Sequence, residues 1–238
     1  MSVSKEIFQN EHIVLPVIHA ETENQVLDNA RVAYEAGCDG IFLINMKDPT
    51  TSTRMSYENL RKLHKMVRSE YATWWIGVNY LDLPAVKVFE NVDSTVSGVW
   101  VDNAEIYEWL DKQVAAHKIL QARENSGWRG LYFGGVAFKY QKEVDNPGLA
   151  AKIATSFVDV VTTSGKATGS APDLEKIRLM KESLGEFPLA IASGVSPENV
   201  KQFMPYADYF IVATSILVHG TENFDINKIK SLIDNVRG

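Results

Sequence analysis

The sequence predicts a (β/α)8 barrel, the TIM-barrel architecture, and three observations favour it. The chain has 238 residues, a usual length for an α/β barrel that forms one domain. Short apolar runs alternate with longer amphipathic segments along the whole chain, and there are eight of each. The apolar runs are nearly continuous, as in parallel strands that helices cover. A doubly wound open sheet is the competing interpretation, but every connection has the length of a βα or αβ step.

The apolar runs are the predicted strands. The first reads HIVLPVIH, and the fifth, GLYFGGVAFK, contains glycines at which a bend or a close approach is expected. In chain order the predicted strands cover residues 12–19, 40–45, 74–80, 97–102, 130–139, 158–164, 188–194 and 208–216.

The amphipathic segments between these strands are the predicted helices. The first ends on Gly37, the third has Pro84 near its start, and the seventh begins with Ser196 as N-cap and Pro197 at its first position. They cover residues 23–37, 56–71, 83–92, 106–125, 146–157, 171–185, 196–204 and 225–237. No linker or low-complexity tract interrupts the alternation, so we expect a single TIM-barrel domain over residues 1–238.

Composition excludes several classes of function. The formal net charge is −6 and no dense cluster of Lys and Arg occurs, so nucleic-acid binding is not expected. A single cysteine, Cys38, excludes an internal disulfide and a cysteine-based zinc site. The N-terminus lacks the apolar core of a secretory signal, and no stretch approaches 18 apolar residues. We therefore expect a cytoplasmic protein without a membrane span.

In a (β/α)8 barrel the active site lies at the carboxyl ends of the strands. Polar residues stand where the predicted strands end, and alternation along each strand points about half of them into the barrel mouth. The strand-end residues are His19, Asn45, Asn79, Asp102, Lys139, Thr163, Ser164, Ser193, Thr214 and Ser215.

Two loops at this end predict a phosphate site. IASGVSPENV, residues 191–200, ends the seventh strand, and ATS, residues 213–215, ends the eighth; many barrels bind phosphate between these loops and a short helix start. Gly194 lets the backbone approach an anion, and SGKATGS, residues 164–170, adds glycines and hydroxyls. A tight turn with a good cap is the alternative. The predicted phosphate- or substrate-binding residues are Ser164, Gly165, Thr168, Gly169, Ser193, Gly194, Val195, Ser196, Thr214, Ser215, Asn45 and Asn79.

Three residues are the candidates for catalysis. Lys139 could hold a phosphate or carboxylate, form a Schiff base, or lie exposed beyond its strand. Asp102 and His19 could act as general base and acid across the mouth. The alternatives are a turn cap for Asp102 and a hydrogen-bonded structural role for His19. Asn45 and Asn79 would orient a hydroxyl or a carbonyl.

No cofactor is predicted. Mg²⁺ could bind through a substrate phosphate near Asp48 and Asp82, but no spacing demands a metal. His64 and His117 fall in helical patterns and are expected at the surface. The first strand is not followed by G-x-G-x-x-G, which argues against a dinucleotide site. Homo-oligomerisation is an option, through a contact that includes Trp74, Trp75, Trp100 and Trp109.

A resemblance to a known family rests on the C-terminal third. SGKATG, PDLEKIR and PLAIASGVSPENVKQFMPYADYFIVATSI resemble the BtpA/SgcQ family of TIM-barrel proteins, and the likeness is specific over residues 163–216. The resemblance implies a TIM barrel. It also links the chain to photosystem I assembly through BtpA-type members and to a suggested role in sugar metabolism through SgcQ-type members. Some relatives are labelled phosphoribosylanthranilate isomerase-like.

The chain departs from the family pattern at several positions. Ser164 replaces a threonine and Ala213 replaces a glycine. At the end of the fifth strand, in the stretch GGVAFKY, Gly135 replaces an acid and Tyr140 replaces a histidine. The lysine of that stretch is kept as Lys139. A divergent member with altered or lost chemistry is therefore expected.

Two functions follow as hypotheses. The first is an enzyme that binds a small phosphorylated metabolite, either a sugar phosphate or a phosphoribosyl compound, with isomerase, lyase or phosphoribosyl-type acid–base chemistry. The second is a non-catalytic, BtpA-like assembly or regulatory factor that binds a ligand or a protein.

Overall fold

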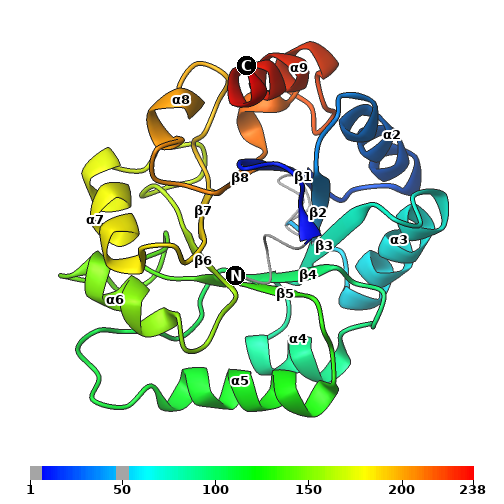
Figure 1. The fold of residues 1–238 in the computed structure, drawn as a ribbon. Coiled ribbons are helices and arrows are strands. Elements are labelled where there is room, and N and C mark those ends of the chain that lie inside the picture. Colours follow the sequence, from blue (N-terminus) through cyan, green and yellow to red (C-terminus); the bar gives the residue numbers. More distant parts are fainter. Residues whose placement is uncertain (1–6, 47–53) are drawn as a thin grey trace.

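The computed structural model describes residues 7–46 and 54–238, and these form a closed eight-stranded parallel barrel in the order β1 to β8 (Figure 1). β8 pairs with β1, with Ile13 beside Tyr209, which closes the ring. The predicted TIM barrel is therefore confirmed. The strands are β1 Ile13–His19, β2 Gly40–Ile44, β3 Trp75–Asn79, β4 Gly98–Val101, β5 Leu131–Gly135, β6 Val160–Thr163, β7 Leu189–Ala192 and β8 Tyr209–Val212.

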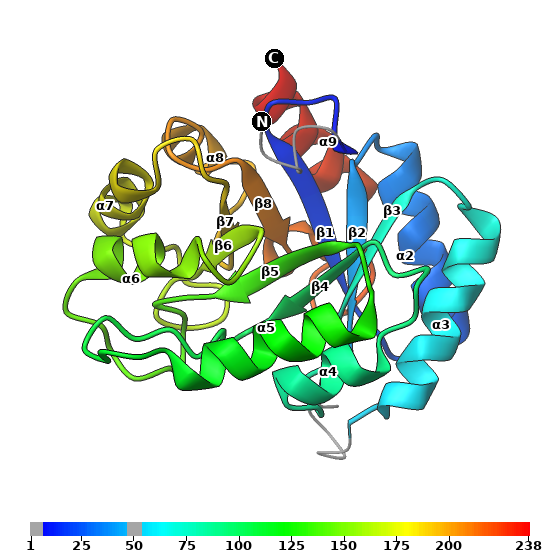
Figure 2. The same cartoon turned by 60° about the horizontal axis from the view of Figure 1, so that its bottom comes forward.

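Helices surround the barrel and cover the outer faces of its strands (Figures 1 and 2). Their bounds are α2 Glu23–Glu35, α3 Tyr57–Glu70, α4 Ala85–Asn91, α5 Val114–Ser126, α6 Pro147–Ala154, α7 Leu174–Leu184, α8 Val200–Phe203 and α9 Ile226–Arg237, with a 3₁₀ helix η1 at Thr214–Ile216. Within the described residues, no helix is both long and apolar enough to cross a bilayer.

The predicted helix over 106–125 is wrong in its first half, because α5 begins only at Val114. The side chain of Gln113 accepts a hydrogen bond from the Tyr107 amide and donates to the carbonyl oxygens of Tyr107 and Leu110. Glu105 adopts a positive φ of 57°. These local bonds hold residues 105–113 as a loop, although their apolar spacing is typical of a helix.

The predicted helix over 196–204 is shorter, since α8 covers only Val200–Phe203 and its N-cap is Asn199, not Ser196. The Asn199 side chain accepts from the amide of Ser196 at 2.8 Å and donates to the carbonyl oxygen of Gly194 at 2.8 Å. It therefore closes the turn after β7. β5 and β8 also end earlier than predicted, at Gly135 and Val212.

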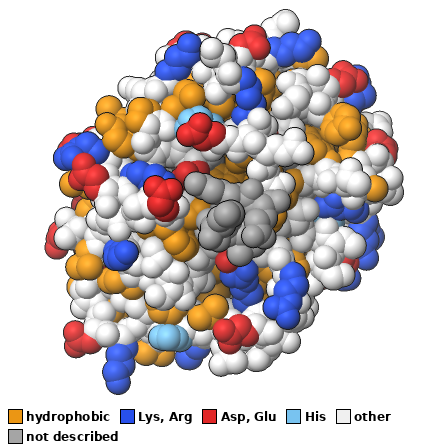
Figure 3. Space-filling view, in the orientation of Figure 1, with side chains coloured by type: hydrophobic (Ala, Val, Ile, Leu, Met, Phe, Trp, Pro, Cys, Tyr) orange, Lys and Arg blue, Asp and Glu red, His pale blue; other side chains and the backbone are white. Residues whose placement is uncertain are grey.

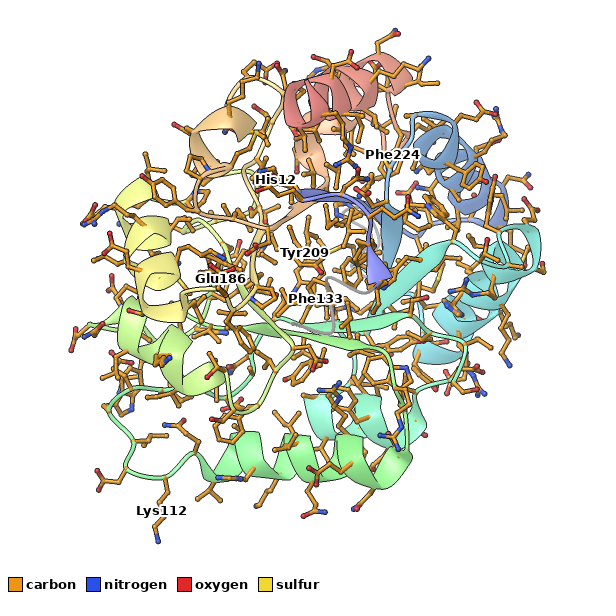
Figure 4. All side chains as sticks on the ribbon, viewed as in Figure 1. His12, Lys112, Phe133, Glu186, Tyr209 and Phe224 are labelled. Atoms are coloured by element: carbon orange, nitrogen blue, oxygen red, sulfur yellow. The ribbon has the colours of Figure 1, made fainter. Side chains whose placement is uncertain are left out.

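Aromatic side chains fill the barrel interior. Phe42, Trp75, Phe133 and Tyr209 meet edge to face, with ring centroids 5.0 Å apart for Phe42–Trp75 and 5.3 Å for Phe133–Tyr209. Phe133 and Tyr209 lie near the barrel axis in Figure 4. Because Trp75 and Trp100 are 7% and 5% exposed inside this packing, the expectation that they form a subunit contact is wrong.

Three aspartates make the same pair of interactions at the amino ends of the strands. Asp39, Asp159 and Asp208 each accept a hydrogen bond from the backbone amide of a neighbouring strand, at 2.8, 2.7 and 2.8 Å. Each also pairs with a cation from a helix: Arg237, Arg123 and Lys181, respectively. The bonds fix where neighbouring strands begin, so this end of the barrel serves stability.

Charge is distributed evenly over the face drawn in Figure 3, where lysine and arginine side chains are interspersed with aspartate and glutamate. Among the described residues on this face, no continuous basic stripe of the kind that tracks a nucleic-acid backbone is seen (Figure 3).

His64 on α3 is buried, with no exposed surface, so its predicted surface position is wrong. Burial, aided by the charge of Arg68, lowers the pKa of His64 to about 4. The unfolded chain therefore binds this proton before the folded chain does as the pH falls. Neutral, buried His64 therefore contributes to the unfolding free energy in a pH-dependent way. This contribution is fully present above the ordinary pKa of about 6.5 and is lost as the pH falls towards 4.

We expect His64→Leu to reduce the acid sensitivity of folding. Between pH 7 and pH 4 the native chain should lose about 3 kcal/mol more unfolding free energy than this variant, because the pKa of His64 falls from the ordinary value of about 6.5 to about 4 on folding. Urea unfolding at both pH values measures this difference. His117→Leu, at an exposed position on α5, serves as the control; equal acid losses for native chain and His64→Leu would contradict the account.

Candidate functional site

A cavity of about 690 Å³ opens at the carboxyl ends of the strands, the catalytic face of this fold. Of the predicted site residues, those that line it are His19, Asp102, Lys139, Thr168, Gly169, Ser193, Gly194, Val195, Ser196, Thr214 and Ser215. Asn45, Asn79, Ser164 and Gly165 are not among its lining residues. Residues that are far apart in the sequence thus meet in one cavity.

The turn after β7 gives this cavity two free donors. Gly194 has φ of +72°, and a Cβ added there would lie 2.2 Å from the carbonyl oxygen of Ser170. Glycine is therefore required twice, by its conformation and by the close approach of the loop after β6. Among the hydrogen bonds of the described residues, none is donated by the amides of Gly194 and Val195.

The neighbouring hydroxyls hold the loops together. Ser193 Oγ accepts from the Gly169 amide at 3.1 Å and donates to the carbonyl oxygen of Ala167. Ser215 Oγ donates to the carbonyl oxygen of Val195 at 2.7 Å. The Ser196 amide is already bonded to Asn199. These serines therefore position the loops after β6, β7 and β8 around the free amides.

Lys139 reaches the same side of the cavity from the loop after β5. Its Nζ donates to Thr168 Oγ1 at 3.2 Å, and its amide donates to Ser164 Oγ at 2.8 Å. Ser164 is fully buried and thus supports this loop from beneath. The loop includes Ala137 and Tyr140 at positive φ, 48° and 63°.

Lys176 on α7 is a supporting residue that sequence reasoning missed. Its Nζ donates to the carbonyl oxygens of Ala137 and Ser164, which follow β5 and β6. Burial lowers its pKa to about 8. From the sequence, a lysine in a helix is expected to be exposed. The structure shows instead that Lys176 connects the loop after β5 to the loop after β6.

His19 is held by a carboxylate. Its Nδ1 lies 2.7 Å from Glu222 Oε2, and the Glu222 carbonyl oxygen accepts from Gln25 and Asn29. A carboxylate accepts a hydrogen bond here, so Nδ1 carries the proton and Nε2 is left for the cavity. Sequence reasoning missed Glu222 because 203 residues separate it from His19.

Asp102 follows β4 and lies on the other side of the cavity. Asn79 Nδ2 donates to its Oδ1 at 2.9 Å. Burial raises the pKa of Asp102, while the bond from Asn79 and the charges of Lys139 and Arg54 partly oppose this. Arg54, a cation that the sequence analysis did not single out, also lines the cavity. Asp102 is thus a partly buried carboxyl with a raised pKa, which suits it to exchange a proton.

Asn45 and Asp82 bond to each other and to the backbone around them. Asn45 Nδ2 donates to Asp82 Oδ1 at 2.6 Å and to the Met55 carbonyl oxygen, and Asn45 Oδ1 accepts from the Leu81 amide. The second oxygen of Asp82 accepts from the Tyr57 amide at 3.0 Å. Both side chains therefore brace the loops after β2 and β3.

A metal site has no support in the part of the chain that the structure describes: no group of three or more His, Cys, Asp and Glu side chains could hold an ion there. Asp48, one of the two predicted contacts for Mg²⁺, lies outside the described residues. Mg²⁺ bound through a substrate phosphate stays a prediction.

The fold and the cavity define a (β/α)8-barrel protein with a ligand-sized cavity at the carboxyl ends of its strands. A model of the BtpA family matches residues 20–238, and the chain belongs to this family. An uncharacterised protein of Methanocaldococcus jannaschii is 25% identical over 222 residues, which cover 87% of this chain and 83% of that protein. The photosystem I biogenesis protein BtpA of Synechocystis is 29% identical over 119 residues, 48% of this chain and 42% of that protein.

Solved structures share the fold at low identity. The (S)-3-O-geranylgeranylglyceryl phosphate synthase of Thermoplasma acidophilum, in complex with its substrate sn-glycerol-1-phosphate, has a TM-score of 0.68 at 15% identity and covers 100% of this chain and 99% of that chain. Phosphoribosyl anthranilate isomerase of Thermococcus kodakaraensis has a TM-score of 0.63 at 15% identity, with 95% and 99% covered.

Three residues that differ from the family pattern, Gly135, Tyr140 and Ala213, lie in different environments. A Cβ at Gly135 would lie 2.0 Å from the carbonyl oxygen of Asp102, so the acid of the pattern does not fit this backbone. Tyr140, in place of a histidine, is 80% exposed and also lines the cavity. Ala213 lines the cavity beside Thr214.

Proposed function

We propose that this protein binds a small phosphorylated metabolite, a sugar phosphate or a phosphoribosyl compound, and catalyses isomerase- or lyase-type acid–base chemistry on it. The observation that carries the proposal is the turn after β7: Gly194 and Val195 line a ligand-sized cavity, and their amides donate none of the hydrogen bonds found among the described residues. Amides that have no protein acceptor bind anions well when the backbone is fixed.

The phosphate subsite consists of the amides of Gly194 and Val195, with Thr214 and Thr168 hydroxyls beside them. Lys139 adds a positive charge and already contacts Thr168. Hydrogen bonds to a charged group contribute about 1.5–3 kcal/mol each, so two amides and a lysine suffice for micromolar to millimolar binding.

Acid–base chemistry is assigned to His19 and Asp102. His19 Nε2 would accept or donate a proton, and Glu222 would stabilise the charged imidazole that results. Asp102, with its pKa raised by burial, would serve as the partner group. Both residues line the cavity that holds the proposed phosphate subsite. Two structural neighbours support a phosphorylated substrate. One is bound to sn-glycerol-1-phosphate, and the other is named phosphoribosyl anthranilate isomerase.

Thermal unfolding against a panel of anions tests the binding. We expect ribose 5-phosphate, phosphoribosyl pyrophosphate or a nucleoside monophosphate to stabilise the fold by about 2.7 kcal/mol at 100 times its dissociation constant. Inorganic phosphate and sulfate should stabilise it less, and sodium chloride of matched ionic strength should not. Absence of a shift with every phosphate would overturn the proposal.

The alternative is a non-catalytic assembly or regulatory factor. The observation in its favour is the likeness to a protein named for photosystem I biogenesis. Hydrogen exchange into a bound ligand separates the two functions, since proton transfer by His19 or Asp102 would move solvent deuterium into the ligand. Tight binding without exchange or conversion would favour the alternative.

A further inference from the structure

The two halves of the cavity differ in how many large apolar side chains line them. Loops after β6, β7 and β8 supply the amides and hydroxyls, among them Gly194, Thr168 and Thr214. The other half comes from β1 to β4 and the loops after them. It holds the large apolar side chains Val17, Ile44, Met46, Leu81 and Trp100, together with the polar His19, Arg54 and Asp102. In the first half the only apolar lining residues larger than alanine are Val195 and Ile211. In the closed strand order, β2–β4 stand across the barrel from β6–β8 (Figure 1).

The apolar side chains of β1–β4 expose hydrophobic surface to a ligand in the cavity. Trp100 borders the cavity, but its indole nitrogen is covered by protein and has no partner among the described residues. Met46 is 36% exposed and Leu81 is half-buried, so both can lose solvent-accessible surface to a ligand. Apolar surface that becomes covered on binding contributes affinity in proportion to its area.

Groups that can exchange a proton line the same cavity. His19 is on β1, beside β8, while Asp102 follows β4. Lys139, after β5, borders the polar half. A ligand that reaches from Gly194 to Leu81 and Trp100 therefore lies in the same cavity as these side chains.

From this division we infer that the ligand is a phosphate ester with a carbon-rich, apolar group at the end opposite its phosphate. The inference rests on the proposed phosphate subsite and narrows its substrate class: a free sugar phosphate would have no apolar group to cover the large apolar side chains of the β1–β4 half. The volume of about 690 Å³ lies within the range of roughly 300–1,000 Å³ in which pockets enclose ligands of this kind.

Calorimetric titration with three monoesters tests the inference: ribose 5-phosphate, 1-naphthyl phosphate and hexyl phosphate. We expect at least one apolar ester to bind about tenfold more tightly than ribose 5-phosphate, from the additional apolar area covered. Preference for the naphthyl or the hexyl ester distinguishes a ring from an alkyl chain. 1-Naphthol, which lacks the phosphate, should bind more weakly than its ester.

A matched pair of variants locates the apolar group. Leu81→Asn should weaken binding of the preferred ester about tenfold and leave that of ribose 5-phosphate within about twofold. Leu110→Asn, at an exposed leucine outside the cavity, should change neither. Circular dichroism confirms that each variant is folded.

Each contrary result has a defined meaning. If ribose 5-phosphate binds as tightly as both apolar esters, the apolar inference is overturned and the proposed phosphate site stands. If an apolar ester binds tightly but Leu81→Asn has no effect, its apolar group lies elsewhere and the inference is overturned. If no ester binds, the proposed function fails together with the inference.

Discussion

Gly194→Ala should abolish measurable phosphate binding, with a dissociation constant raised by at least about 100-fold. The new Cβ would overlap the Ser170 carbonyl, so the loops after β6 and β7 must separate and the amides of Gly194 and Val195 lose their alignment. Two hydrogen bonds to a charged group, at about 1.5–3 kcal/mol each, account for a loss of that size. Isothermal titration with the phosphate ester that binds most tightly measures it.

Gly127→Ala is the matched control. Gly127 has a similar φ of +66° at the end of α5, but a Cβ there meets nothing within 4 Å. It therefore carries the same conformational cost, about 1 kcal/mol, without disturbing the cavity. If Gly127→Ala weakened phosphate binding as much as Gly194→Ala, general strain and not the site would be responsible.

His19→Asn should reduce proton transfer about 10²- to 10⁴-fold, the usual contribution of a positioned acid or base. Phosphate affinity should change by less than about threefold, because His19 belongs to β1 and not to the proposed phosphate subsite. Deuterium incorporation from heavy water at C2 of ribose 5-phosphate, beside the aldehyde of its open-chain form, followed by nuclear magnetic resonance, measures this directly.

Glu222→Gln tests whether the histidine depends on its carboxylate. The side chain keeps its size and can still bond to His19, but it cannot stabilise a charged imidazole. We expect a smaller decrease than for His19→Asn and unchanged ligand affinity. His219→Asn, an exposed histidine three residues earlier, should have no effect. Equal rates for all four proteins would remove His19 from the mechanism.

The architecture was predictable because it depends on periodicity. Continuous apolar runs such as 12–19 and 40–45 are long enough to identify strands by themselves, and their alternation with helices leaves few topologies. The predicted helix over 106–125 is wrong before Val114, because hydrogen bonds from the Gln113 side chain to Tyr107 and Leu110 stabilise a loop there. Such competition depends on the three-dimensional path of the backbone, which apolar spacing does not reveal.

The candidate site was only partly predictable. Strand ends identify residues near the mouth, so His19, Asp102 and Lys139 could be selected, whereas the orientation of Asn45 and Asn79 could not. Glu222 and Lys176 act through contacts with distant segments, and nothing in their local sequence indicates this. The sequence was sufficient to place Gly194 in a turn. Its close approach to Ser170 could be seen only in the structure.

The most direct test of the central claim is the amide spectrum of isotopically labelled protein during a titration with ribose 5-phosphate. Amide protons that donate to a phosphate shift strongly, so those of Gly194 and Val195 should show the largest and saturable changes. Sodium chloride at the same ionic strength should not shift them. Unchanged Gly194 and Val195 signals, with or without changes elsewhere, would contradict the phosphate site at the end of β7.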